Sequence, residues 1–207
     1  AMQAVLQGAG LGGLTIDSRD APQALQRLGA LLRVTVRGVL DLLQARNEVR
    51  TGFNIPSHTQ VGAINNNPFK SLTVARAGPR SREEQVLGLL LGGPDPAYLP
   101  PVQALQQAFD DVKAHELAVM AGMEAALAQL LERFRPDNLK ARIDQGSVLD
   151  NVLPGGRRAR YWEEFQRLYE EIVQEARDDS QKLFEGEFER AYEALVRKLA
   201  QRPESGP

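Results

Sequence analysis

The chain has 207 residues, of which 43% are apolar and 25% charged, and its formal net charge is −2. This composition is typical of a folded globular protein, and the near-neutral charge gives no electrostatic basis for nucleic-acid binding. The chain contains no cysteine, which excludes disulfides, thiolate catalysis and zinc–sulfur sites. No apolar run reaches the ~18 residues that a membrane-spanning helix needs, so direct membrane insertion is not expected.

Near the N-terminus, Gly8, Gly10 and Gly13 match the letters of the dinucleotide-binding motif G-x-G-x-x-G. That motif binds a cofactor only where it connects a strand to a helix. Here only a short apolar segment precedes it and polar turn residues follow it. A short helix that stops at a glycine is therefore the better interpretation, and no cofactor is expected.

Residues 22–50 form the first long helix that the sequence predicts, with Asp20 as its candidate N-cap. Apolar residues at intervals of three and four define the face expected to be buried. This face consists of Leu25, Leu28, Leu32, Val36, Val39 and Leu43. The arginines of the helix, including Arg46 and Arg50, are expected on a solvated face.

Residues 51–80 lose the helical period, because proline, glycine and asparagine recur through them. A structureless connection of this length is usually either functional or disordered. Within it, three asparagines at residues 65–67 are followed by Pro68, Phe69 and Lys70. Two interpretations stay open for this segment: a packed turn that caps neighbouring helices, or a loop that contacts a partner.

A short helix is predicted after this loop, because Ser81 and Glu84 form a capping box ahead of an apolar run. The longest helix follows over residues 99–134. Midway along it, where another apolar residue is due, the sequence has His115 and Glu116. The apolar stripe expected on this helix consists of Val102, Leu105, Phe109, Val112, Val119, Met123, Leu127, Leu130 and Phe134.

A short helix near residues 137–146 and a helical segment over residues 157–200 complete the chain. Acidic residues and Gly186 interrupt the second segment, which is one kinked helix or two in tandem. The sequence therefore predicts an all-α fold, a helical bundle of two to three long helices plus several short ones, with a long irregular loop around residues 51–80.

The expected domain organisation is simple. Residues 5–200 are expected to form a single all-helical domain. Residues 1–4 are expected to be a disordered cloning remnant, and residues 201–207 a flexible tail.

Two histidines are the obvious candidates for chemistry: His58 in the loop and His115 in the longest helix. Asp111 lies one helical turn before His115, so a hydrogen bond between them is geometrically reasonable. A metal ligand or general base would need further ligands from other helices. A structural polar network is the favoured interpretation, and no metal or catalytic residue is expected.

No nucleotide-binding, metalloprotease or hydrolase signature occurs in the sequence, so nothing in it specifies an enzyme. Three arginines, Arg157, Arg158 and Arg160, stand at the start of the last helical segment, where the helix dipole disfavours cations. Either an anionic partner or an unpaired surface cluster accounts for them.

Several short segments together resemble one known family, in order and spacing, although none is specific alone. They include Leu6-Gln-Gly-Ala-Gly-Leu11, Asn66-Asn-Pro-Phe-Lys70, Tyr98-Leu-Pro-Pro101, Ala108-Phe-Asp-Asp111, Leu131-Glu-Arg-Phe-Arg-Pro136 and Arg160-Tyr-Trp162. Over residues 5–200 the chain is similar to the C-terminal domain of the FHA-domain proteins of bacterial type VI secretion systems.

The resemblance implies a cytoplasmic, non-enzymatic scaffold or adaptor that links phosphorylation signalling to assembly of the secretion machine. The implied partners are membrane-complex or baseplate proteins, which would hold the domain at the inner face of the bacterial inner membrane. Self-association into a homo-oligomer stays open. Asp111 and His115 are expected to be structural. The candidate partner contacts are Arg46, Arg50, Asn66, Asn67, Pro68, Phe69 and Lys70.

The family typically reads Asn-Asn-Pro-Leu-Lys-Phe-Ser, whereas this chain has Phe69 in place of the leucine and Ser71-Leu72 after Lys70. If this loop is a docking element, its partner preference could differ from that of the family. Phosphopeptide recognition belongs to the N-terminal FHA module of such proteins and is not expected of these residues. Two other function classes remain alternatives. One is a metal-binding helical-bundle enzyme centred on Asp111 and His115, and the other a peripheral lipid-surface binder that uses the basic side of residues 25–50.

Overall fold

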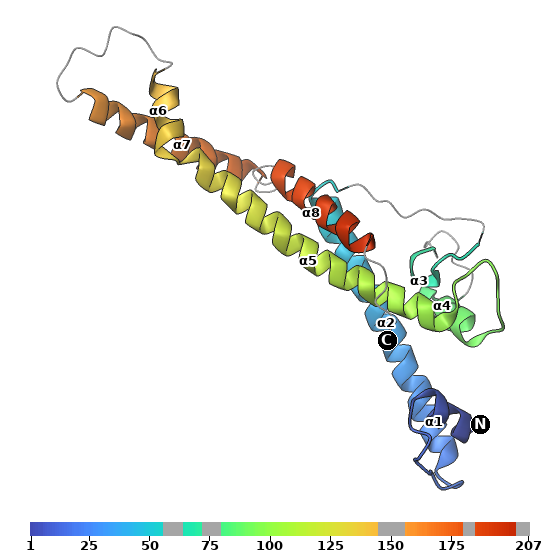
Figure 1. The fold of residues 1–207 in the computed structure, drawn as a ribbon. Helices are drawn as coiled ribbons and strands as arrows, with labels where there is room; N and C mark the ends of the chain where they lie inside the picture. Colours follow the sequence, from blue (N-terminus) through green and yellow to red (C-terminus); the bar gives the residue numbers. More distant parts are fainter. Residues whose placement is uncertain (56–63, 72–79, 145–155, 180–184, 202–207) are drawn as a thin grey trace. The chain divides into compact units, whose positions relative to one another are not determined.

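The computed structural model describes residues 1–55, 64–71, 80–144, 156–179 and 185–201. Within these ranges there is no β-strand, only an isolated bridge, so the predicted all-α fold is confirmed. Figure 1 labels the helices. They are α1 (Met2–Gly8), α2 (Ala21–Gly52), α3 (Pro68–Ser71), α4 (Arg82–Leu91), α5 (Pro101–Arg133), α6 (Pro136–Asp144), α7 (Gly156–Asp179) and α8 (Glu185–Ala200).

The chain divides into two compact units. Unit 1 comprises Ala1–Ala45 and Thr59–Phe109, and unit 2 comprises Arg46–His58 and Asp110–Pro207. The two longest helices, α2 and α5, each contribute residues to both units.

Local sequence signals place the helix ends in unit 1. The glycine motif is not preceded by a strand: α1 ends at Gly8, and Gly10 has a positive φ of 73°, as the predicted glycine stop requires. At the start of α4, Ser81 Oγ accepts a hydrogen bond from Glu84 N, and Glu84 Oε2 accepts one from Ser81 N. The predicted capping box is confirmed.

The loop prediction for residues 51–80 needs one correction. α2 continues to Gly52, and residues 68–71 form the short helix α3. Pro68 occupies the first turn of α3, where a missing N–H has no consequence. A helix of a single turn is too short to show a helical period, so no periodic signal predicted α3. Residues 56–63 and 72–79 lie outside the described residues.

The expected buried face of α2 is right for its second half and wrong for its first. Val36 and Val39 are fully buried, whereas Leu25 and Leu28 are exposed. Periodicity marks a helix as amphipathic along its whole length, but only tertiary packing decides how much of the apolar stripe is covered.

The stripe of large apolar residues predicted for α5 is only partly buried: Val119 and Leu130 pack against the core clusters, but the most deeply buried positions are others. Of that stripe, Val102, Met123 and Leu127 are more than half exposed. The buried residues of α5 are small, apart from His115: Ala104, Ala108, Ala118, Gly122 and Ala126. They recur at steps of three, four and seven, which place them on one side of the helix next to the predicted stripe, so His115 fills a core position and does not interrupt the buried face.

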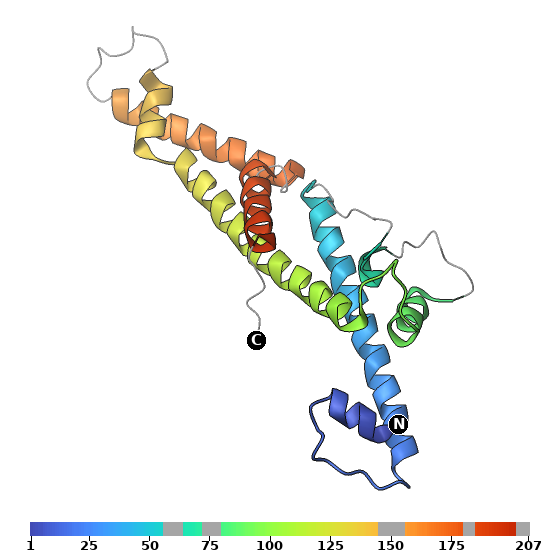
Figure 2. The same cartoon turned by 45° about the vertical axis from the view of Figure 1, so that its right-hand side comes forward.

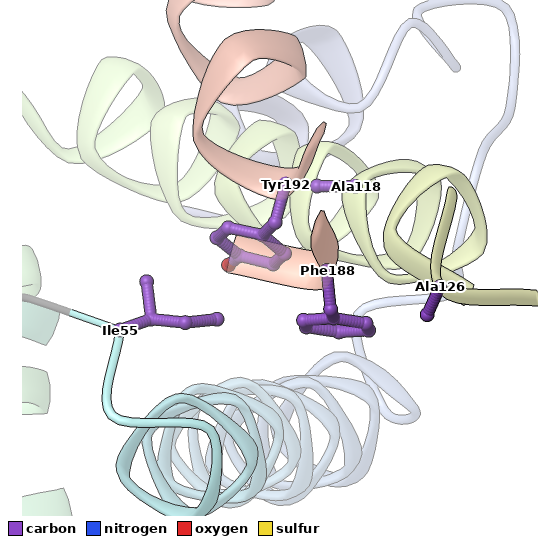
Figure 3. Close-up of a cluster of buried hydrophobic side chains, with 5 residues drawn as sticks. All are labelled: Ile55, Ala118, Ala126, Phe188 and Tyr192. Atoms are coloured by element: carbon purple, nitrogen blue, oxygen red, sulfur yellow. The ribbon is translucent and has the colours of Figure 1, made fainter. Parts of the chain in front are cut away.

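Small residues on α5 matter because large side chains from elsewhere fill the core of unit 2. This core consists of Ile55, Ala118, Ala126, Phe188 and Tyr192, and Figure 3 shows how Phe188 and Tyr192 of α8 lie between Ile55 and α5. A second ring, Phe53, stacks on Phe188 with centroids 4.1 Å apart. Alanines on α5 leave room for these aromatic rings.

A second cluster of unit 2 joins α5 to α7. Leu168 and Ile172 of α7 are buried against Leu130 and Phe134, which are both in the apolar stripe predicted for residues 99–134. α7 runs back alongside the C-terminal part of α5 in both views (Figures 1 and 2). The two helices therefore form an antiparallel pair, connected through α6. The predicted C-terminal segment is described as α7 and α8, and residues 180–184 between them lie outside the described residues.

Candidate functional site

The segment predicted to contact partners, residues 65–70, is held in unit 1 by backbone and side-chain hydrogen bonds. Asn66 N donates to Ala97 O at 2.9 Å, and Leu99 N donates to Asn66 O at 2.9 Å. The Asn66 side-chain amide also donates to Ala97 O. Asn65 can enter this turn because its φ of 56° is one that asparagine tolerates.

Asn67 is the N-cap of α3 and also fastens this helix to α5. Its Oδ1 accepts a hydrogen bond from Phe69 N at 3.0 Å. Its Nδ2 donates to Ala104 O at 2.9 Å and to Gln107 Oε1 at 2.7 Å. Asn67 is buried, and its side chain is hydrogen-bonded to both α3 and α5. Replacing it therefore removes hydrogen bonds that water cannot easily replace.

Phe69 is completely buried, with 0% of its surface exposed, and Pro68 is buried beside it. Arg82 Nη2 donates to the Phe69 carbonyl oxygen at 2.8 Å. Burial lowers the pKa of this guanidinium. The side chains of Asn67, Pro68 and Phe69 thus lie inside unit 1, and those of Asn66 and Lys70 are partly exposed.

In unit 2, a buried polar cluster brings together four residues that the sequence singled out. Arg50 is only 8% exposed, and Arg46 Nη1 lies 3.8 Å from Asp111 Oδ2. Burial lowers the pKa of Arg50, and the charge of Arg46 acts in the same direction. The expectation that Arg46 and Arg50 lie on a solvated face is therefore wrong: Arg50 is buried, and only 15% of the Arg46 side chain is exposed.

His115 is the fourth residue of the cluster and is buried. Its Nδ1 is hydrogen-bonded to Tyr192 Oη at 2.8 Å, with the two rings edge to face. Burial lowers the pKa of His115, and the charges of Arg46 and Arg50 lower it further against the opposing effect of Glu116. The imidazole is consequently neutral at pH 7.

The sequence did not identify Tyr192 as a polar partner. Tyr192 lies four residues after Phe188, a spacing that fits the apolar face of a helix, and its hydroxyl leaves no trace in that periodicity. His115 and Tyr192 are 77 positions apart, so no local signal could have paired them.

The other features considered as functional sites are a metal site, a membrane-spanning helix, His58 and the arginines at the start of α7. Among the described residues, no three histidine, aspartate or glutamate side chains lie close enough together to hold a metal ion. None of the helices in the described ranges is long and apolar enough to cross a membrane. His58 and the side chains of Arg157 and Arg158 lie outside the described residues.

A comparison with protein families shows to which family the chain belongs. A family model described as the C-terminal domain of Type VI secretion system FHA protein matches residues 7–195. The chain belongs to this family. No curated protein and no solved structure matches it significantly.

Membership of the type VI secretion FHA C-terminal family makes the departure at Phe69 easier to interpret. Phe69, at which the resemblance implied a departure from leucine, is fully buried. The difference therefore lies in the packing of unit 1 and not in an exposed side chain that a partner could touch directly.

Proposed function

We propose that this chain is a non-enzymatic scaffold or adaptor domain of a type VI secretion FHA protein, which contacts membrane-complex or baseplate proteins. One observation supports this proposal above the others. The side chains that could take part in a reaction are occupied by contacts within the chain: His115 is hydrogen-bonded to Tyr192, and Asp111 faces Arg46. What the described residues offer to another molecule is mainly surface.

The proposal also covers the bounds of the domain and its location in the cell. Residues 5–200 act as one functional domain, a proposal supported by the family match over residues 7–195. The domain works in the cytoplasm, held at the inner face of the bacterial inner membrane through its partners.

Within unit 1, Asn66 and Lys70 are the proposed contact residues, because they are partly exposed. Asn67, Pro68 and Phe69 set their position from inside. In unit 2, Arg46 and Arg50 act in the same indirect way by fixing α2 beside Asp111.

The test compares variants in the complete FHA protein. Lys70→Glu should weaken pull-down of secretion components and lower secretion, while the helical circular dichroism stays unchanged. Lys113→Glu is the matched control, because Lys113 is an exposed lysine that pairs with Asp110, one turn earlier on the same helix. Unchanged binding and secretion in the Lys70→Glu protein would contradict the assignment of this segment.

A further inference from the structure

We draw no further inference here: the strongest candidate, the exposed apolar surface patch of unit 2 that Met123 and Leu127 of α5 form with Trp162 of α7, is an unpartnered helix face, and nothing in the structure shows what covers it.

Discussion

Gly122 lies directly against the ring of Phe188. A Cβ atom at residue 122 would come within 2.6 Å of Phe188 Cδ2, closer than real Cβ contacts allow. Phe188 cannot easily retreat, because it is buried and stacked on Phe53. The close approach of α8 to α5 therefore depends on a glycine, and the buried alanines of α5 continue the same surface of small residues.

Gly122→Ala should destabilise unit 2 by about 1–3 kcal/mol, because overpacking at a buried ring forces side chains off their preferred rotamers. Urea unfolding followed by circular dichroism measures the effect. Gly38→Ala is the control, since its Cβ would meet nothing within 4 Å and alanine is a better helix former. That variant should be neutral or more stable. Equal stability of the two variants would contradict the packing described for Phe188.

Tyr192→Phe should destabilise unit 2 by about 1–2 kcal/mol, because it removes the hydroxyl that is hydrogen-bonded to the buried His115 Nδ1. Tyr169→Phe deletes the same atom from an exposed tyrosine and should change stability by less than about 0.5 kcal/mol. A thermal unfolding series on the two proteins would show the difference.

Acidification should destabilise unit 2 between pH 7.5 and pH 5.5. The pKa of His115 is lowered in the folded state, so the unfolded chain binds a proton first as the pH falls through about 6.5. The contribution of His115 to the free energy of unfolding is fully present above that pH. It is lost below that pH, by no more than about 1.4 kcal/mol per pH unit. His115→Asn should flatten the dependence of urea midpoint on pH in this range. An unchanged slope would show that His115 is not responsible.

Asn67→Asp should destabilise unit 1. The variant keeps the oxygen that caps Phe69 N but replaces the amide that donates to Ala104 O, so two oxygens face each other in a buried site. We expect a loss of about 1–3 kcal/mol, measured by urea unfolding. Asn65→Asp, at an exposed position of the same turn, is the control and should be close to neutral. A neutral Asn67→Asp would mean that the amide bonds contribute nothing.

The family itself could be recognised from the sequence, because short motifs in the right order extend over nearly the whole chain. The candidate contacts were less predictable. Nothing in Asn67-Pro68-Phe69 shows that these side chains are buried, since turn-forming residues occur equally in exposed and packed loops. The burial of Arg50 was also hidden, because a charged residue is normally expected on the surface.

The sequence by itself determined the elements whose causes are local. The capping box of Ser81 and Glu84, the glycine stop after α1 and the spans of α2 and α5 depend on residues within a few turns of one another. Only the tertiary structure decided which face of α5 is buried. The largest apolar residues of that helix remain outside, because aromatic rings from α8 and from the end of α2 need the small residues opposite, and that requirement comes from positions more than sixty residues away along the chain.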